Sequence, residues 1–159
     1  MLVACATDPM STRSLPTLFG RATIVLGEHA RLRETMALLT VEGPHTDDSP
    51  RGEVRLHELI ERCTDELIEH FATEEADGYF GTLVTDCPRL ASAVLRLEVE
   101  HEEMRREIKE IRALAGRVGS AREAGRRIRA LIGRLQIHEH AENVVLQEFF
   151  LADDPQESS

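Results

Sequence analysis

Apolar residues recur at steps of three and four along most of the chain, which is the spacing of helices with one buried face. The last of these stripes contains Ile128, Leu131, Leu135, Val145 and Phe149. Comparable stripes run over residues 18–39, 56–74 and 90–114. The pattern therefore predicts four long amphipathic helices and no sheet.

Prolines, glycines and capping residues mark where these helices begin and end. The predicted helices run over residues 16–41, from Pro50 until the pattern weakens at Gly78, from Asp86-Cys87-Pro88 to Gly116, and from a capping box at Ser120 to about residue 151. A short helical corner is predicted over residues 79–84.

Four helices of similar length joined by short turns favour an all-α, up-down-up-down antiparallel four-helix bundle. We expect residues 14–151 to form this single domain, preceded by a flexible N-terminal arm over residues 1–13. Residues 152–159 are polar and are predicted to be a disordered tail.

Composition agrees with a helical protein and limits its partners. Aromatic residues make up 4% of the chain, and tryptophan is absent. The formal net charge of −10 argues against a nucleic-acid partner, because phosphate binding needs a basic patch. Three cysteines without a Cys-x-x-Cys motif, and no apolar run long enough to cross a membrane, predict a cytoplasmic protein that contacts no membrane.

Polar residues interrupt the apolar stripes at a few related positions. Each predicted long helix has one histidine on its stripe, and these are His29, His70, His101 and His138. Glu74 and Glu142 follow one turn after the second and fourth of these histidines. A buried carboxylate costs several kcal/mol unless it is paired or binds a metal, so these positions need an explanation.

The four histidines are predicted to lie at one height in the bundle. In an antiparallel hairpin, two residues are level when the turn lies midway between them. The loop over residues 43–49, the turn over residues 78–88 and Gly119-Ser120 each lie close to midway between consecutive histidines. We therefore expect one layer that contains all four imidazoles and both carboxylates.

A single histidine on an apolar face is usually a hydrogen-bonded core residue, but this set is harder to explain in that way. Without a metal, two buried acids would repel each other or take up protons. Imidazole and carboxylate ligands suit iron, manganese or zinc, and bridging carboxylates suit two ions. A ferritin-like site is excluded because it needs two Glu-x-x-His motifs on helices, and only residues 98–101 provide one within a predicted helix.

Other polar residues near the layer are assigned weaker roles. Helical geometry places His57 and His140 away from it. Glu75 and Glu98 flank it as candidate hydrogen-bond acceptors for the histidines. Cys63 and Tyr79 are expected mainly to fill the core.

The motifs Gly27-Glu28-His29, His70-x3-Glu74-Glu75, Glu100-His101-Glu102 and His138-x3-Glu142-Asn143 make residues 14–150 resemble the hemerythrin-like, or HHE cation-binding, family. The resemblance implies a four-helix bundle that holds a non-heme di-iron centre with bridging carboxylates. It also implies a protein that binds or senses dioxygen or another small ligand, iron or redox state.

Two positions depart from the oxygen-carrying members of that family. Arg105 stands where a second histidine follows the helix-three histidine, and Glu142 replaces an aspartate one residue further on. The candidate metal ligands are then six: His29, His70, Glu74, His101, His138 and Glu142. Arg105 is expected to turn away and pair with Glu75, Glu98 or Glu102, which leaves one ion with an open position.

Three functions remain open at this point. The first is a di-iron protein that binds or senses dioxygen, iron or redox state, with no catalytic residue assigned and no protein partner identified. The second is a ferroxidase or peroxidase-type enzyme at the same centre. The third is a mononuclear or zinc-filled structural site.

Overall fold

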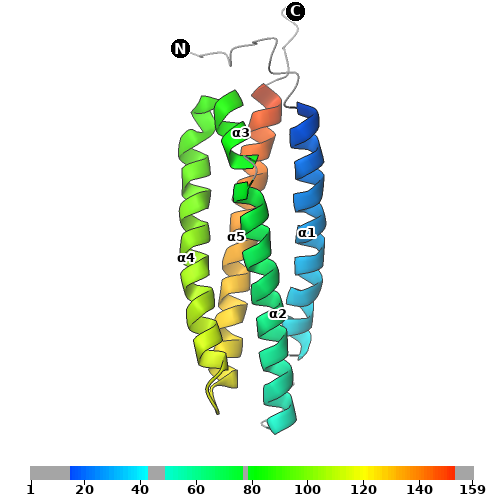
Figure 1. Cartoon of the computed structure of the whole chain (residues 1–159), viewed down its shortest axis with the longest axis vertical. Helices are drawn as coiled ribbons and strands as arrows, with labels where there is room; N and C mark the ends of the chain where they lie inside the picture. The colour runs from blue at the N-terminus through cyan, green and yellow to red at the C-terminus, as the bar shows by residue number, and fades with distance from the viewer. Residues whose placement is uncertain (1–14, 43–48, 77–78, 153–159) are drawn as a thin grey trace, which may run out of the picture.

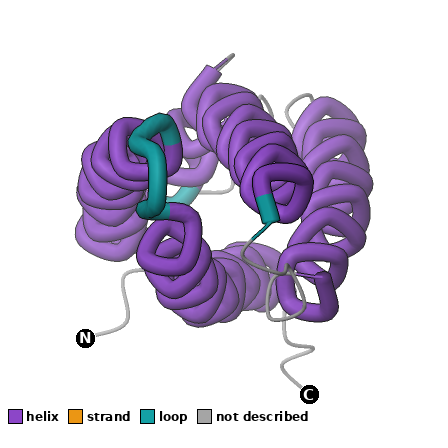
Figure 2. The backbone as a smooth tube through the Cα atoms, turned by 90° about the horizontal axis from the view of Figure 1, so that it is seen from below, coloured by secondary structure: helices purple, strands orange, loops and turns teal. Residues whose placement is uncertain are grey.

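The computed structural model describes residues 15–42, 49–76 and 79–152, and nearly all of these residues are helical (Figure 1). The long helices are α1 (Leu15–Glu42), α2 (Pro50–Glu75), α4 (Ala91–Ala115) and α5 (Ala121–Ala152). Consecutive long helices run in opposite directions, and the end view in Figure 2 shows them around a common axis. The prediction of an all-α antiparallel four-helix bundle is confirmed.

The start of α2 follows from its first residues. Ser49 is the N-cap, and its hydroxyl oxygen accepts a hydrogen bond from the Gly52 N–H at 3.1 Å. Pro50 occupies the first helical position, where the missing N–H costs nothing. The start of this helix at Pro50 was predicted from the sequence. Residues 43–48 of the predicted loop, the predicted arm and residues 153–159 of the predicted tail lie outside the described residues.

The corner between α2 and α4 differs in detail from the prediction. It contains the helix α3 (Tyr79–Asp86), which is two residues longer than expected, and the 3-10 turn η3 (Pro88–Leu90). The third long helix begins only at Ala91. Cys87 is extended, with φ −136° and ψ 79°, because a residue before proline avoids the helical region.

The core consists of two apolar clusters stacked along the bundle. One cluster includes Leu67, Phe71, Met104 and Leu135, and it occupies the end where the α4–α5 turn lies. The other includes Phe80, Leu97, Val145 and Phe149, and it lies beneath α3. Four of the predicted residues lie between the two clusters in sequence, and these are Glu74, His101, His138 and Glu142. His70 directly precedes Phe71 of the first cluster. The polar layer therefore divides an otherwise continuous apolar core.

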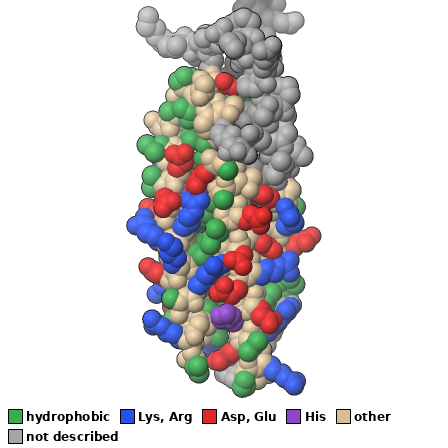
Figure 3. Space-filling view, in the orientation of Figure 1, with side chains coloured by type: hydrophobic (Ala, Val, Ile, Leu, Met, Phe, Trp, Pro, Cys, Tyr) green, Lys and Arg blue, Asp and Glu red, His purple; other side chains and the backbone are tan. Residues whose placement is uncertain are grey.

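Acidic and basic side chains are interspersed on the face of the bundle in Figure 3. Arg134 on α5, for example, pairs with Glu103 and Glu107 on α4 at 3.0 and 2.8 Å. Exposed pairs of this kind contribute about 0–1 kcal/mol each. None of the described helices combines the length and apolar character that crossing a bilayer demands.

The turn between α4 and α5 depends on one glycine, which supplies a matched test of the fold. Gly119 has φ +77°, a region that costs an L side chain about 1–2 kcal/mol. Gly133 is helical, and an added Cβ there meets nothing within 4 Å. Gly119→Ala should lower the free energy of unfolding by about that amount. Gly133→Ala should raise it by about 0.5–1 kcal/mol.

Urea denaturation of both variants and the parent protein in one buffer measures these changes. Shifts of the same sign for the two substitutions would contradict the turn geometry described for Gly119.

Candidate metal centre

Four buried histidines, one from each long helix, turn the same ring nitrogen toward the axis of the bundle. Nε2 of His29 on α1 lies 3.0 Å from Nε2 of His70 on α2. Nε2 of His101 on α4 lies 2.9 Å from Nε2 of His138 on α5. All four side chains are buried. The expected layer of histidines is present, and it is built from two pairs.

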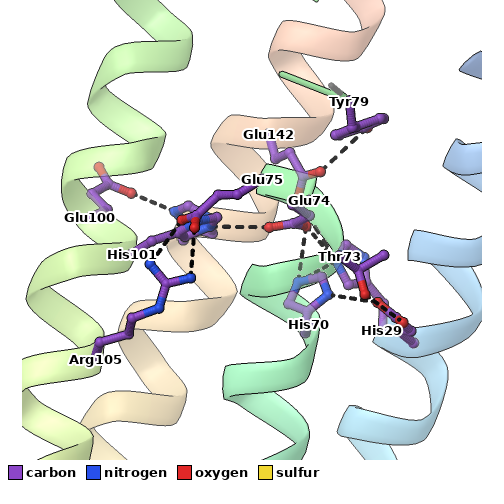
Figure 4. Close-up of polar contacts among 12 residues, drawn as sticks. His29, His70, Thr73, Glu74, Glu75, Tyr79, Glu100, His101, Arg105 and Glu142 are labelled. Atoms are coloured by element: carbon purple, nitrogen blue, oxygen red, sulfur yellow. Dashed lines mark hydrogen bonds and ion pairs between the residues drawn. The ribbon is translucent and has the colours of Figure 1, made fainter. Parts of the chain in front are cut away.

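Glu74 lies between the two pairs and contacts both of them (Figure 4). Its Oε1 is 3.0 Å from Nε2 of His70 and 3.6 Å from Nε2 of His29. Its Oε2 is 3.1 Å from Nε2 of His101. Each oxygen of this one carboxylate therefore faces a different pair of histidines.

Glu142 completes the layer from α5. Its Oε2 lies 3.8 Å from Nε2 of His29, and its Oε1 accepts a hydrogen bond from the Tyr79 hydroxyl at 3.4 Å. Tyr79 is 1% exposed, so it fills the core as predicted and also contacts the layer. Glu142 therefore belongs with the histidine pair of α1 and α2.

The six candidate ligands form two groups that share Glu74. In each group, the potential donor atoms all lie within 4.8 Å of one another. The first group has four members and the second has three, and they are His29, His70, Glu74 and Glu142, and Glu74, His101 and His138.

The oxygens of these glutamates have too few hydrogen-bond donors. Both oxygens of Glu74 and Oε2 of Glu142 are buried without a hydrogen-bond partner. Buried polar atoms are nearly always satisfied in folded proteins, so these three atoms call for a cation. Imidazole nitrogens and carboxylate oxygens are ligands that transition metals accept, and the set therefore fits a metal.

Carboxylates outside the layer hold the other ring nitrogen of three histidines. Nδ1 of His101 is 2.8 Å from Glu75, and Nδ1 of His138 is 2.7 Å from Glu100. Nδ1 of His70 is 3.4 Å from Glu28. Such an acceptor fixes the proton on Nδ1 and leaves the Nε2 lone pair free for a metal, which is the usual arrangement around ligating histidines.

The sequence-based assignment of these outer acceptors was correct for Glu75. Glu98 is exposed, and Glu100 contacts His138 in its place. Glu28 was not assigned this role either. A partial signal was present, because a glutamate directly precedes the histidine in α1, α2 and α4. In α1 and α4 this glutamate contacts the histidine of the next long helix and not its own neighbour.

Residues expected to lie away from the layer do so. His140 is exposed and His57 is half-buried. Cys63 is buried in the larger apolar cluster, and burial raises the pKa of its thiol to about 12. Arg105 turns away from the layer to pair with Glu75 and Glu102, as expected.

The pKa values of the two central carboxyls, Glu74 and Glu142, are shifted in opposite directions. Burial and the adjacent Glu74 charge raise the pKa of Glu142 to about 10. Burial opposes ionisation of Glu74 too, but the surrounding histidine rings hold its pKa well below the usual range. Without a cation, the layer thus keeps one carboxylate ionised and one carboxyl protonated, as expected for two acids in one buried site.

Comparison with known proteins places this layer in a family. The model of the hemerythrin HHE cation binding domain matches residues 22–149, which is most of the chain and contains all six candidate ligands. No curated protein and no solved structure matches the chain.

The pKa of Glu142 predicts how protein freed of metal by chelation responds to pH. A carboxyl whose pKa rises from 4.5 to about 10 on folding stabilises the folded state fully below 4.5. That contribution is lost as the pH rises through about 10. His138 instead lowers the stability of the folded state as the pH falls, because burial lowers the pKa of its imidazole. The Tm of the chelated protein should therefore fall as the pH is raised from about 6.5 to 9.

Thermal melts in the presence of a chelator measure this slope, and Glu142→Gln is the matched variant that should remove most of it. A Tm of the chelated parent protein that rises with pH over the same interval would contradict the burial of two interacting carboxyls.

Proposed function

Because this chain belongs to the hemerythrin HHE cation-binding domain family, we propose that its buried layer holds two iron ions and binds or senses dioxygen, iron or redox state. The first ion is assigned to the group with Glu142, and the second to the group of Glu74, His101 and His138. Glu74 would contribute one carboxylate oxygen to each ion.

The position of Glu74 is the observation that carries this proposal. Its two oxygens face histidine pairs on opposite sides and have no hydrogen-bond donors. A single ion would leave one of these oxygens buried without a partner. Two ions bridged by one carboxylate satisfy both oxygens, and carboxylate-bridged pairs are common in two-metal sites.

Iron is favoured by the family resemblance and agrees with the ligands. Imidazole and carboxylate donors accept iron, manganese or zinc, so the ligand set alone does not select among them. The sequence motifs resemble those of the di-iron members of the family. Bound iron would supply a reversible change of oxidation state and a coordination position for a small ligand.

The chain itself orients the ligands and keeps water from the layer. Phe71 stacks on the His101 ring with centroids 4.3 Å apart, and Phe80 lies 5.7 Å from the same ring. Both phenylalanines are buried. They form an apolar wall beside the three-donor group, where an ion has fewer protein ligands. This environment favours a small ligand such as dioxygen over a large substrate.

The same asymmetry supports the enzyme alternative. An ion held by Glu74, His101 and His138 keeps positions at which peroxide or another oxidant can bind. A ferroxidase or peroxidase-type activity is therefore the second candidate. A mononuclear or zinc-filled structural site is the third, and it does not account for both oxygens of Glu74.

We also propose a cytoplasmic location, without a nucleic-acid or membrane partner. Cys63 is a free thiol, which is usual in a reducing compartment. The acidic net charge of −10 disfavours nucleic acid.

Metal content tests the di-iron proposal most simply. Protein from iron-supplied cells should contain about two iron ions per chain. His29→Ala and His138→Ala should each lose about one ion, because each removes a ligand from one group only. Glu74→Ala should lose both ions, since it removes the shared ligand. His140→Ala is the control, because that histidine is exposed and should leave the metal content unchanged.

Elemental analysis after gel filtration gives these numbers. One tightly held zinc per chain, the same whatever metal the cells receive, would overturn the di-iron proposal and support the structural site.

Peroxide reactivity separates the binding protein from the enzyme. A sensor or binding protein should react with peroxide in about one oxidation of each centre and then stop. Stopped-flow absorbance of the reduced, iron-loaded protein follows this reaction. Sustained turnover with excess peroxide and a reductant would instead establish the enzyme alternative.

A further inference from the structure

The guanidinium of Arg105 makes a bidentate contact with Glu75, whose carboxylate contacts the ring of His101. Nη1 and Nη2 of Arg105 donate to Oε1 and Oε2 of Glu75 at 2.9 and 2.8 Å. Oε1 of Glu75 is in turn 2.8 Å from Nδ1 of His101. Polar contacts thus connect the guanidinium of Arg105 to the imidazole of His101 through the Glu75 carboxylate, as Figure 4 shows.

The same arginine also lies beside the phenylalanine ring that stacks on that imidazole. Its guanidinium carbon lies 5.6 Å from the centroid of the Phe71 ring. Phe71 stacks on His101 with 23° between the ring planes. Glu102 contacts Arg105 from one turn earlier on α4, at 2.9 Å. The side chain of Arg105 is therefore held in place by three partners beside a fully buried histidine.

Among the residues that the structure describes, the other two outer carboxylates are not paired with an arginine or lysine. Glu100 contacts Nδ1 of His138 at 2.7 Å, and over the described ranges of the chain no arginine or lysine pairs with it. Glu28, which contacts His70, accepts a hydrogen bond from the Thr73 hydroxyl at 3.1 Å. Of these three carboxylates, Glu75 alone contacts both a histidine and a guanidinium within the described part of the chain.

We propose that Arg105 is a positioning residue that acts through Glu75 to fix the His101 ring and to make it a weaker electron donor than His138. This inference rests on the proposed metal centre.

The physical reason is competition for the carboxylate charge. A carboxylate on Nδ1–H draws the proton toward itself and makes Nε2 a stronger metal ligand. A bidentate guanidinium binds the same oxygens in charge-assisted hydrogen bonds and weakens this pull. His101 and His138 then ligate the same ion with unequal strength. The reduction potential of an iron ion in this group should therefore be higher, because a weaker imidazole donor favours the reduced ion.

The test uses the nitrogen-15 chemical shifts of the histidine rings, with zinc as the diamagnetic probe. In zinc-loaded Arg105→Gln, the Nδ1 resonance of His101 should move toward the imidazolate position, while that of His138 stays in place. Arg105→Lys keeps the charge but not the bidentate contact, and should give a smaller shift. Arg134→Gln is the matched control, because Arg134 pairs with two glutamates that contact no histidine nitrogen.

The route through Glu75 is tested in a second background. In Glu75→Gln protein, adding Arg105→Gln should change the His101 resonance little, because the carboxylate that links them is gone. In iron-loaded protein, Arg105→Gln should move the reduction potential to more negative values. A purely structural role would shift or broaden the histidine resonances together, and Arg105→Lys would not restore them.

An unchanged Nδ1 resonance of His101 in Arg105→Gln would overturn this inference, as would an equal effect in the Glu75→Gln background. Failure of the metal centre itself looks different. The Nε2 resonances of the parent protein would then not respond to added zinc, whatever Arg105 does to Nδ1.

Discussion

Two carboxylates buried side by side in the middle of a helical bundle are the constraint on which the structure depends. Glu74 and Glu142 are 0% and 1% exposed, and three of their four oxygens have no hydrogen-bond partner. Only a proton or a cation can offset that cost. The surrounding histidines direct Nε2 at the same space, so the layer is organised for cations and not for a water-filled polar network.

The rest of the bundle holds this layer in place. Two apolar clusters close it from both sides, and each long helix contributes one histidine to it. The outer carboxylates come from neighbouring helices, so the packing of α1 on α2 and of α4 on α5 sets the orientation of the imidazoles. A helix that rotated by one residue, about 100°, would remove both its ligand and the acceptor it supplies. Function and fold are therefore specified by the same register.

Much of this arrangement followed from the sequence, because helical period and turn position together give the face and the height of a residue. His101 and His138 were expected at one level from the position of Gly119-Ser120 alone. Contacts at the edges of the buried helix faces were harder to predict. An apolar stripe shows which side of a helix is buried, but not which neighbouring helix lies beside each edge. Glu98 and Glu100 are both near the layer in sequence, and only the packing of α4 against α5 selects Glu100. Likewise, the position of Glu74 between the two histidine pairs depends on side-chain directions that spacing does not contain.

Anomalous diffraction at the iron edge, from crystals of protein loaded with iron, tests the central claim most directly. The account predicts two peaks per chain about 3.5–4 Å apart, with the carboxylate of Glu74 between them. A single peak, or peaks that lie away from Glu74, would contradict it.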